Sequence, residues 1–144
     1  MIRACLLPLI FACPSLASAE TKLIDVTALP SGLAYDVAKV TPLAMTAEGV
    51  PAMLIMSLKD GDVVPPHATD GGLRLLTVLS GTLSWGDGSS VDETSERTFG
   101  PGSLLTIEAG DDHWLAARKG AVELQIVLLD DEAPVAGIEA QLQD

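Results

Sequence analysis

The feature that most limits how this chain can fold is a series of short apolar runs separated by turns that contain Gly or Pro. The runs cover residues 52–58, 73–79, 82–85, 103–107, 113–116 and 121–129. No stretch has the length and periodicity of a normal helix, and the polar residues 91–97 fit one helical turn at most. Many short strands joined by such turns predict an all-β sandwich or barrel.

The first 19 residues have the organisation of an export signal. Arg3 precedes an apolar stretch over residues 4–12, and Ala17-Ser18-Ala19 forms a small-x-small cleavage site. We therefore predict a signal peptide over 1–19, a barrel domain over 20–132 and a C-terminal tail over 133–144, in a periplasmic or secreted protein. Lipidation of Cys13 is the alternative, although a bulky Phe11 lies close before it. Both cysteines, Cys5 and Cys13, would leave with the signal.

The mature chain would be strongly acidic. Loss of Arg3 leaves 7 basic against 20 acidic residues, a formal net charge of −13. Nucleic acids and anionic membranes both need a basic surface, so neither is an expected partner. With 48% apolar residues, the chain can fill one core, which fits a single domain of this length.

Two segments carry polar residues that suggest a site. Pro65-Pro66 imposes an extended backbone just before His67, one of only two histidines. In the strand expected over 73–79, alternation puts Arg74 on the same face as Leu76 and Val78. The second histidine, His113, begins another expected strand.

These segments resemble the two sequence motifs of the cupin superfamily. Gly61, five residues and then His67 open the first motif, and Gly81 closes it. Gly102, five residues, Glu108-Ala109-Gly110, two residues and His113 match the second. The chain is most similar to small exported single-domain cupins of the type-2 kind. The resemblance implies a double-stranded β-helix, also called a jelly roll, and a homodimer as the assembly.

The departures from the motifs affect the metal site. The resemblance places His67 and His113 at two metal-ligand positions, whereas Thr69 replaces a second histidine and Arg74 replaces a glutamate; Glu108 stands at a proline position. Catalytic metal sites generally have three protein ligands. An arginine ~4 Å from a dication at an effective dielectric of ~20 would add about 8 kcal/mol of repulsion. We therefore predict a degenerate metal site and no cofactor.

Several interpretations of the pocket remain open. In the first, the protein binds a small anionic molecule, such as a carboxylate or sulfonate, with no assigned chemistry. Its ligand-binding residues are His67, Thr69, Arg74, His113 and Gln125. In the second, Arg74 pairs with Glu123 or another acid inside the barrel and only fills the space left by a lost metal. In the third, a divalent transition metal bound by His67, His113 and a substitute carboxylate makes the protein a dioxygenase, isomerase or lyase. The candidate carboxylates are Asp70, Asp112 and Glu123. A structural dimer without a pocket is the fourth.

Overall fold

The computed structural model describes residues 21–130, so the expected signal peptide and tail lie outside the described residues. The described part contains ten strands and one short 3-10 helix, which confirms the all-β prediction. The elements are η1 (Val26–Ala28), β1 (Gly32–Ala34), β2 (Ala38–Met45), β3 (Pro51–Leu58), β4 (Val63–His67), β5 (Leu73–Ser80), β6 (Leu83–Asp87), β7 (Arg97–Phe99), β8 (Leu104–Ile107), β9 (His113–Ala116) and β10 (Val122–Leu129). Within residues 21–130, none of the helical structure has the length and hydropathy of a membrane span.

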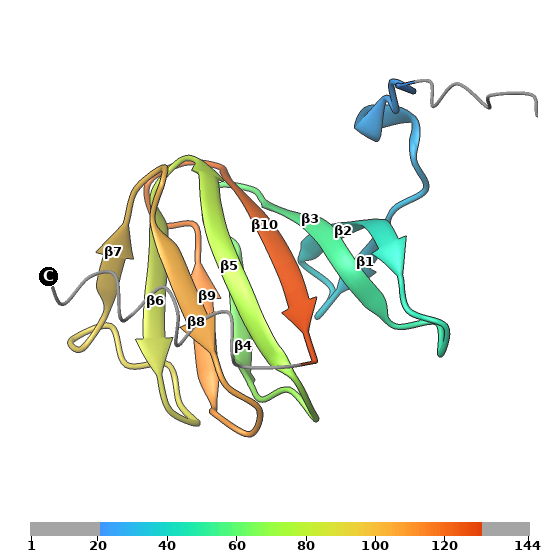
Figure 1. The fold of residues 1–144 in the computed structure, drawn as a ribbon. Helices are drawn as coiled ribbons and strands as arrows, with labels where there is room; N and C mark the ends of the chain where they lie inside the picture. The colour runs from blue at the N-terminus through green and yellow to red at the C-terminus, as the bar shows by residue number, and fades with distance from the viewer. Residues whose placement is uncertain (1–20, 131–144) are drawn as a thin grey trace, which may run out of the picture.

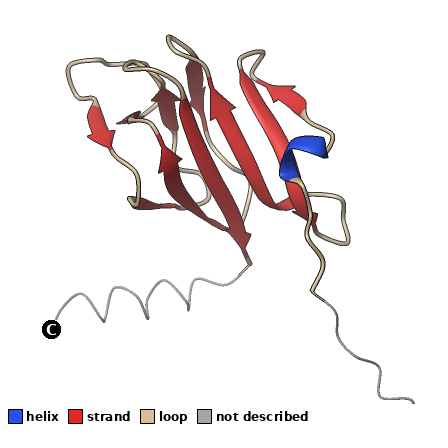
Figure 2. Ribbon diagram, turned by 90° about the horizontal axis from the view of Figure 1, so that it is seen from above, coloured by secondary structure: helices blue, strands red, loops and turns tan. Residues whose placement is uncertain are grey.

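The strands form two antiparallel sheets that pack as two layers (Figures 1 and 2). One sheet has the order β1-β2-β3-β10-β5-β8, and the other has the order β4-β9-β6-β7. The helix η1 buries no residue and lies away from both layers in Figure 1. This arrangement confirms the expected double-stranded jelly roll.

The core lies between the two sheets and is built by the inward-facing residues of their strands. Leu76 and Val78 of β5 are fully buried, as are Leu124 of β10 and Leu83 of β6. The expectation that residues 52–58 would be buried on both faces is wrong, because only the inward Met56 and Leu58 of β3 are buried. An antiparallel sheet in a sandwich turns one face to the core and leaves the other in contact with water.

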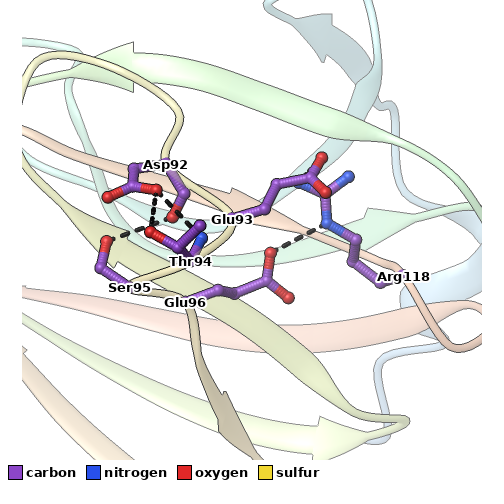
Figure 3. Close-up of polar contacts among 6 residues, drawn as sticks. All are labelled: Asp92, Glu93, Thr94, Ser95, Glu96 and Arg118. Carbon is purple, nitrogen blue, oxygen red and sulfur yellow. Dashed lines mark hydrogen bonds and ion pairs between the residues drawn. The ribbon is translucent and has the colours of Figure 1, made fainter.

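The loop between β6 and β7 contains a single hydrogen-bonded turn, in which Ser95 N–H donates to the carbonyl of Asp92 at 3.2 Å, and it forms no helix. The carboxylate of Asp92 accepts hydrogen bonds from the backbone N–H and the hydroxyl of Thr94, which favours a turn over a helix (Figure 3). Arg118 holds the loop from the other side. Its Nε donates to Glu96 at 2.9 Å, and its Nη2 lies 3.0 Å from Glu93 Oε1.

Gly86 allows a tryptophan to pack against the outer face of the second sheet. It is paired with Trp114 in the β6–β9 register, and the indole is completely buried. A Cβ on Gly86 would lie 2.1 Å from a ring carbon of Trp114. The missing side chain is therefore required for this close packing, one residue away from His113.

Candidate functional site

The two histidines lie side by side at one end of the sandwich, which we call the mouth. At the mouth β4, β6, β8 and β10 end, while β5 and β9 begin. The β4–β9 register pairs His67 with His113, and their ring centroids are 4.4 Å apart. Pro65 and Pro66 are tolerated in β4 because it is an edge strand, which pairs on one side only and so does not need a backbone N–H at every position. The structure thus brings together two residues that are 46 positions apart in the sequence.

Backbone carbonyls determine which ring nitrogen carries the hydrogen in both imidazoles. Nδ1 of His67 lies 2.9 Å from the carbonyl oxygen of Pro65, and Nδ1 of His113 lies 2.8 Å from that of Asp111. A carbonyl oxygen only accepts, so each Nδ1 must carry the hydrogen. In the neutral rings, Nε2 is then left as an acceptor.

His113 is the buried member of the pair, with only 4% of its surface exposed. Its ring stacks on Trp85 at a centroid distance of 4.7 Å. Burial lowers the pKa of His113 below its ordinary value, and the nearby His67 and Arg74 act in the same direction. Neutral pH therefore leaves this imidazole uncharged.

Arg74 lies on the inward face of β5, as predicted from alternation. It shares that face with the buried Leu76 and Val78 and pairs with Leu128 of β10. Its Nη1 donates one hydrogen bond, 3.3 Å long, to the carbonyl of Gly71. Among residues 21–130, no carboxylate lies within the 4.0 Å of an ion pair with Arg74. Loss of water lowers the pKa of the guanidinium, and this effect outweighs the opposing charges of Tyr35 and Asp70.

Tyr35 lies against His67 at the mouth, although the sequence analysis did not identify it as a site residue. Its ring centroid lies 4.5 Å from that of His67, and its backbone has a positive φ of 53°. Asp36 follows with φ 61°, and Val37 donates to the carbonyl of Ala34, so the β1–β2 connection is a tight hairpin turn. A bulky residue in this conformation is uncommon. The available signal was that Tyr35 is the only tyrosine in the chain.

Thr69 is near the histidine pair through the backbone. Its carbonyl accepts a 3.0 Å hydrogen bond from Gly110, which ties together the turns before β5 and β9. The Thr69 hydroxyl is enclosed and has no hydrogen-bond partner in the described part of the chain. An enclosed hydroxyl without a partner is costly unless a ligand or water completes it.

Gln125 does not belong to this group, and here the prediction needs correction. In the register, Gln125 pairs with Thr77 and Ile55, while its neighbour Leu124 pairs with the buried Val78. Gln125 therefore lies on the outer face of the first sheet, opposite to Arg74. Glu123 is exposed on the same outer face, so the alternative in which it neutralises Arg74 is wrong as well.

Two hollows open at the mouth. The larger, of about 610 Å³, lies beside His113 and is bordered by Trp85, Asp87, Phe99, Leu105 and Ile107. The smaller, of about 410 Å³, lies beside Arg74 and is bordered by Thr46, Glu48, Asp70, Leu128 and Asp130. His113 therefore lines a partly apolar opening, and Arg74 lines a second one that is rimmed by carboxylates.

The described residues do not fit a three-ligand metal site. In residues 21–130, no three His, Cys, Asp or Glu side chains are grouped so that they could hold a metal ion. The proposed substitute carboxylates Asp70, Asp112 and Glu123 therefore do not complete the histidine pair. The carboxylate that influences His113 is that of Asp87, which already accepts hydrogen bonds from Trp85 and Arg97. We derive no metal-dependent step from this arrangement.

Comparisons with known proteins bear on the fold. No family model and no curated protein match the sequence. By contrast, 347 chains of known structure match the three-dimensional fold. A predicted oxalate decarboxylase from Thermotoga maritima superposes with a TM-score of 0.57 at 15% identity, covering 75% of this chain and 100% of that chain. The polyketide cyclase RemF from Streptomyces resistomycificus gives 0.61 at 16% identity, covering 78% of this chain and 81% of the other.

A cupin superfamily protein from Desulfitobacterium hafniense DCB-2 gives a TM-score of 0.50 at 22% identity, over 69% of this chain and 84% of that chain. At such low identities the likeness shows the fold alone, and this chain has the cupin fold. The similar structures also include Drosophila melanogaster CENP-C bound to CAL1, at 11% identity over 74% of this chain and 85% of that chain, with a TM-score of 0.60. Enzymes and a protein-binding protein thus share the architecture, so an activity has to be argued from the site.

Proposed function

We propose that this cupin-fold protein binds a small organic anion with one negative charge, a carboxylate or a sulfonate, at the mouth of the sandwich. The guanidinium of Arg74 would hold the anionic group, with His67, His113 and Thr69 around it. No chemistry is assigned to the bound molecule. The leader-like residues 1–19, which lie outside the described residues, are the reason to propose that binding takes place after export.

The observation that carries this proposal is the lack of an ionic partner for Arg74. A guanidinium has five N–H donors, and Arg74 uses one of them in a long hydrogen bond to Gly71. Partial loss of water already costs free energy, and the lowered pKa of Arg74 reflects that cost. An anion held by two parallel hydrogen bonds would offset it.

The surrounding charges support a ligand with a single negative charge. Glu48, Asp70 and Asp130 border the hollow beside Arg74, and the whole chain has a formal net charge of −12. A molecule with two or three negative charges would be repelled by these carboxylates. A monoanion can approach because the local field of Arg74 opposes that of the rim.

A thermal-shift screen tests the proposal. Acetate, propionate, lactate and methanesulfonate would be titrated against the wild type, Arg74→Met and the charge-matched control Lys39→Met. Lys39 is exposed on β2 of the same sheet. A ligand at 100 times its Kd stabilises a protein by about 2.7 kcal/mol. We expect such stabilisation in the wild type and the control and its loss in Arg74→Met. Stabilisation that persists in Arg74→Met, or none with any anion, would contradict the proposal.

A further inference from the structure

The hydrogen-bonding roles of the histidine ring nitrogens restrict the class of ligand further. We propose that the ligand is a hydroxy acid with one carboxylate, which lies on Arg74 while its hydroxyl donates to Nε2 of His67 or His113. This inference rests on the proposed anion site and names the class of molecule that the site accepts.

The first step is that the histidine edges facing away from the backbone are acceptors. Both Nδ1 atoms donate to backbone carbonyls, at 2.9 Å for His67 and 2.8 Å for His113. A neutral imidazole with its hydrogen on Nδ1 has a lone pair on Nε2. The two rings, whose centroids are 4.4 Å apart, therefore carry one acceptor each.

The second step is that the charges around His113 keep it neutral. His67 of β4 and Arg74 of β5 face it and disfavour a positive charge, and burial has the same effect on its pKa. Asp87 of β6 is the acid that favours protonation, but its two oxygens are bound by Trp85 Nε1 and Arg97 Nη2. His113 therefore remains an acceptor at neutral pH.

The third step concerns complementarity. A plain carboxylate has acceptors only, so it can satisfy Arg74 but would meet the Nε2 lone pairs with oxygen lone pairs of its own. Buried acceptors that lose water without gaining a donor reduce affinity. A hydroxyl group on the ligand supplies the missing donor. A molecule with a carboxylate and a nearby hydroxyl therefore matches one cation and two acceptors better than the carboxylate alone.

The experiment compares matched pairs of ligands that differ by one hydroxyl: glycolate with acetate, and lactate with propionate. Affinities would be measured by isothermal titration at pH 7.5 on the full-length mature protein. One net hydrogen bond corresponds to an affinity that is about three- to tenfold tighter for the hydroxy acid. In His67→Phe, which keeps a ring against Tyr35 but has no nitrogen, the affinity for lactate should fall more than the affinity for propionate, so the preference for the hydroxy acid should shrink.

A second measurement avoids dependence on one variant. His113→Phe keeps a ring against Trp85 but removes the other Nε2 acceptor, so the advantage of lactate over propionate should shrink in this variant too. Equal affinity for lactate and propionate at pH 7.5, or a preference unchanged both by His67→Phe and by His113→Phe, would overturn the hydroxy-acid assignment. These results would leave the anion site intact, provided that propionate still binds and needs Arg74. If none of the anions binds, the proposed function itself fails.

Discussion

Replacing Arg74 with methionine is expected to stabilise the ligand-free protein while abolishing anion binding. Methionine keeps an unbranched apolar stem against the inward face of β5, so little packing should be lost. The hydrogen bond to the carbonyl of Gly71 is 3.3 Å long and lies near the surface, and its loss should cost about 0.5 kcal/mol. Removing a partly desolvated charge that has no acid within ion-pair distance should raise the free energy of unfolding by about 1–1.5 kcal/mol, after a discount for exposure.

The net expectation for Arg74→Met is a free energy of unfolding that is higher by about 0.5–1 kcal/mol, which corresponds to a Tm higher by about 2–5 °C for a domain of this size. Chemical denaturation in urea, with Lys39→Met as the control, measures the difference. Lys39 is exposed, and its variant should stay within about 0.5 kcal/mol of the wild type. A loss of more than about 1 kcal/mol in Arg74→Met would show that the guanidinium has a structural ionic partner, and the reasoning would be refuted.

Three further predictions concern pH, close packing and the loop between β6 and β7. Burial lowers the pKa of His113 in the folded state, so the unfolded chain binds more protons below about pH 6.5, and the free energy of unfolding should fall as the pH drops from there through the folded pKa. Urea unfolding from pH 7.5 to 5 measures this fall, and His113→Phe should flatten the dependence on pH. Gly86→Ala should cost about 2–3 kcal/mol, because the new Cβ would overlap the buried indole, whereas Gly100→Ala, with no atom within 4 Å of the added Cβ, should be nearly neutral in thermal unfolding. Arg118→Met should lower the free energy of unfolding by about 1–3 kcal/mol, because it leaves the Glu96 carboxylate, only 13% exposed, without its cation. The variant should also speed proteolysis of residues 88–96. Unchanged cleavage would argue against the role of the Arg118 contacts in Figure 3.

The strands that alternate clearly were predictable from sequence. Arg74 and Leu76 could be assigned to one face of β5 because side chains alternate, and the apolar Leu76 indicated which face is inward. The strand at His113 was also recognisable, since Gly110 ends the preceding turn at a position where φ is 85°.

The features that sequence missed depend on pairing between distant strands. In β10, apolar residues occupy both faces, so only the register with β5 shows that Leu124 points inward and Gln125 outward. A register irregularity between Glu123 and Leu124 also shifts which residues of β10 and β5 lie opposite each other, and strict alternation along the sequence does not predict such a shift. Tyr35 was missed for the same reason, because its contact with His67 joins the edges of two different sheets.

The most direct test of the central claim is the arginine side-chain region of a ¹H–¹⁵N NMR spectrum during titration with lactate. The described residues contain three arginines, and Arg97 and Arg118 are both held in ion pairs, which makes them internal controls. Arg74→Lys identifies the third signal. We predict that the Nε–Hε signal of Arg74 shifts and saturates with lactate while the other two stay in place. A titration in which the Arg74 signal does not move, or in which Arg97 or Arg118 moves instead, would contradict an anion site held by Arg74.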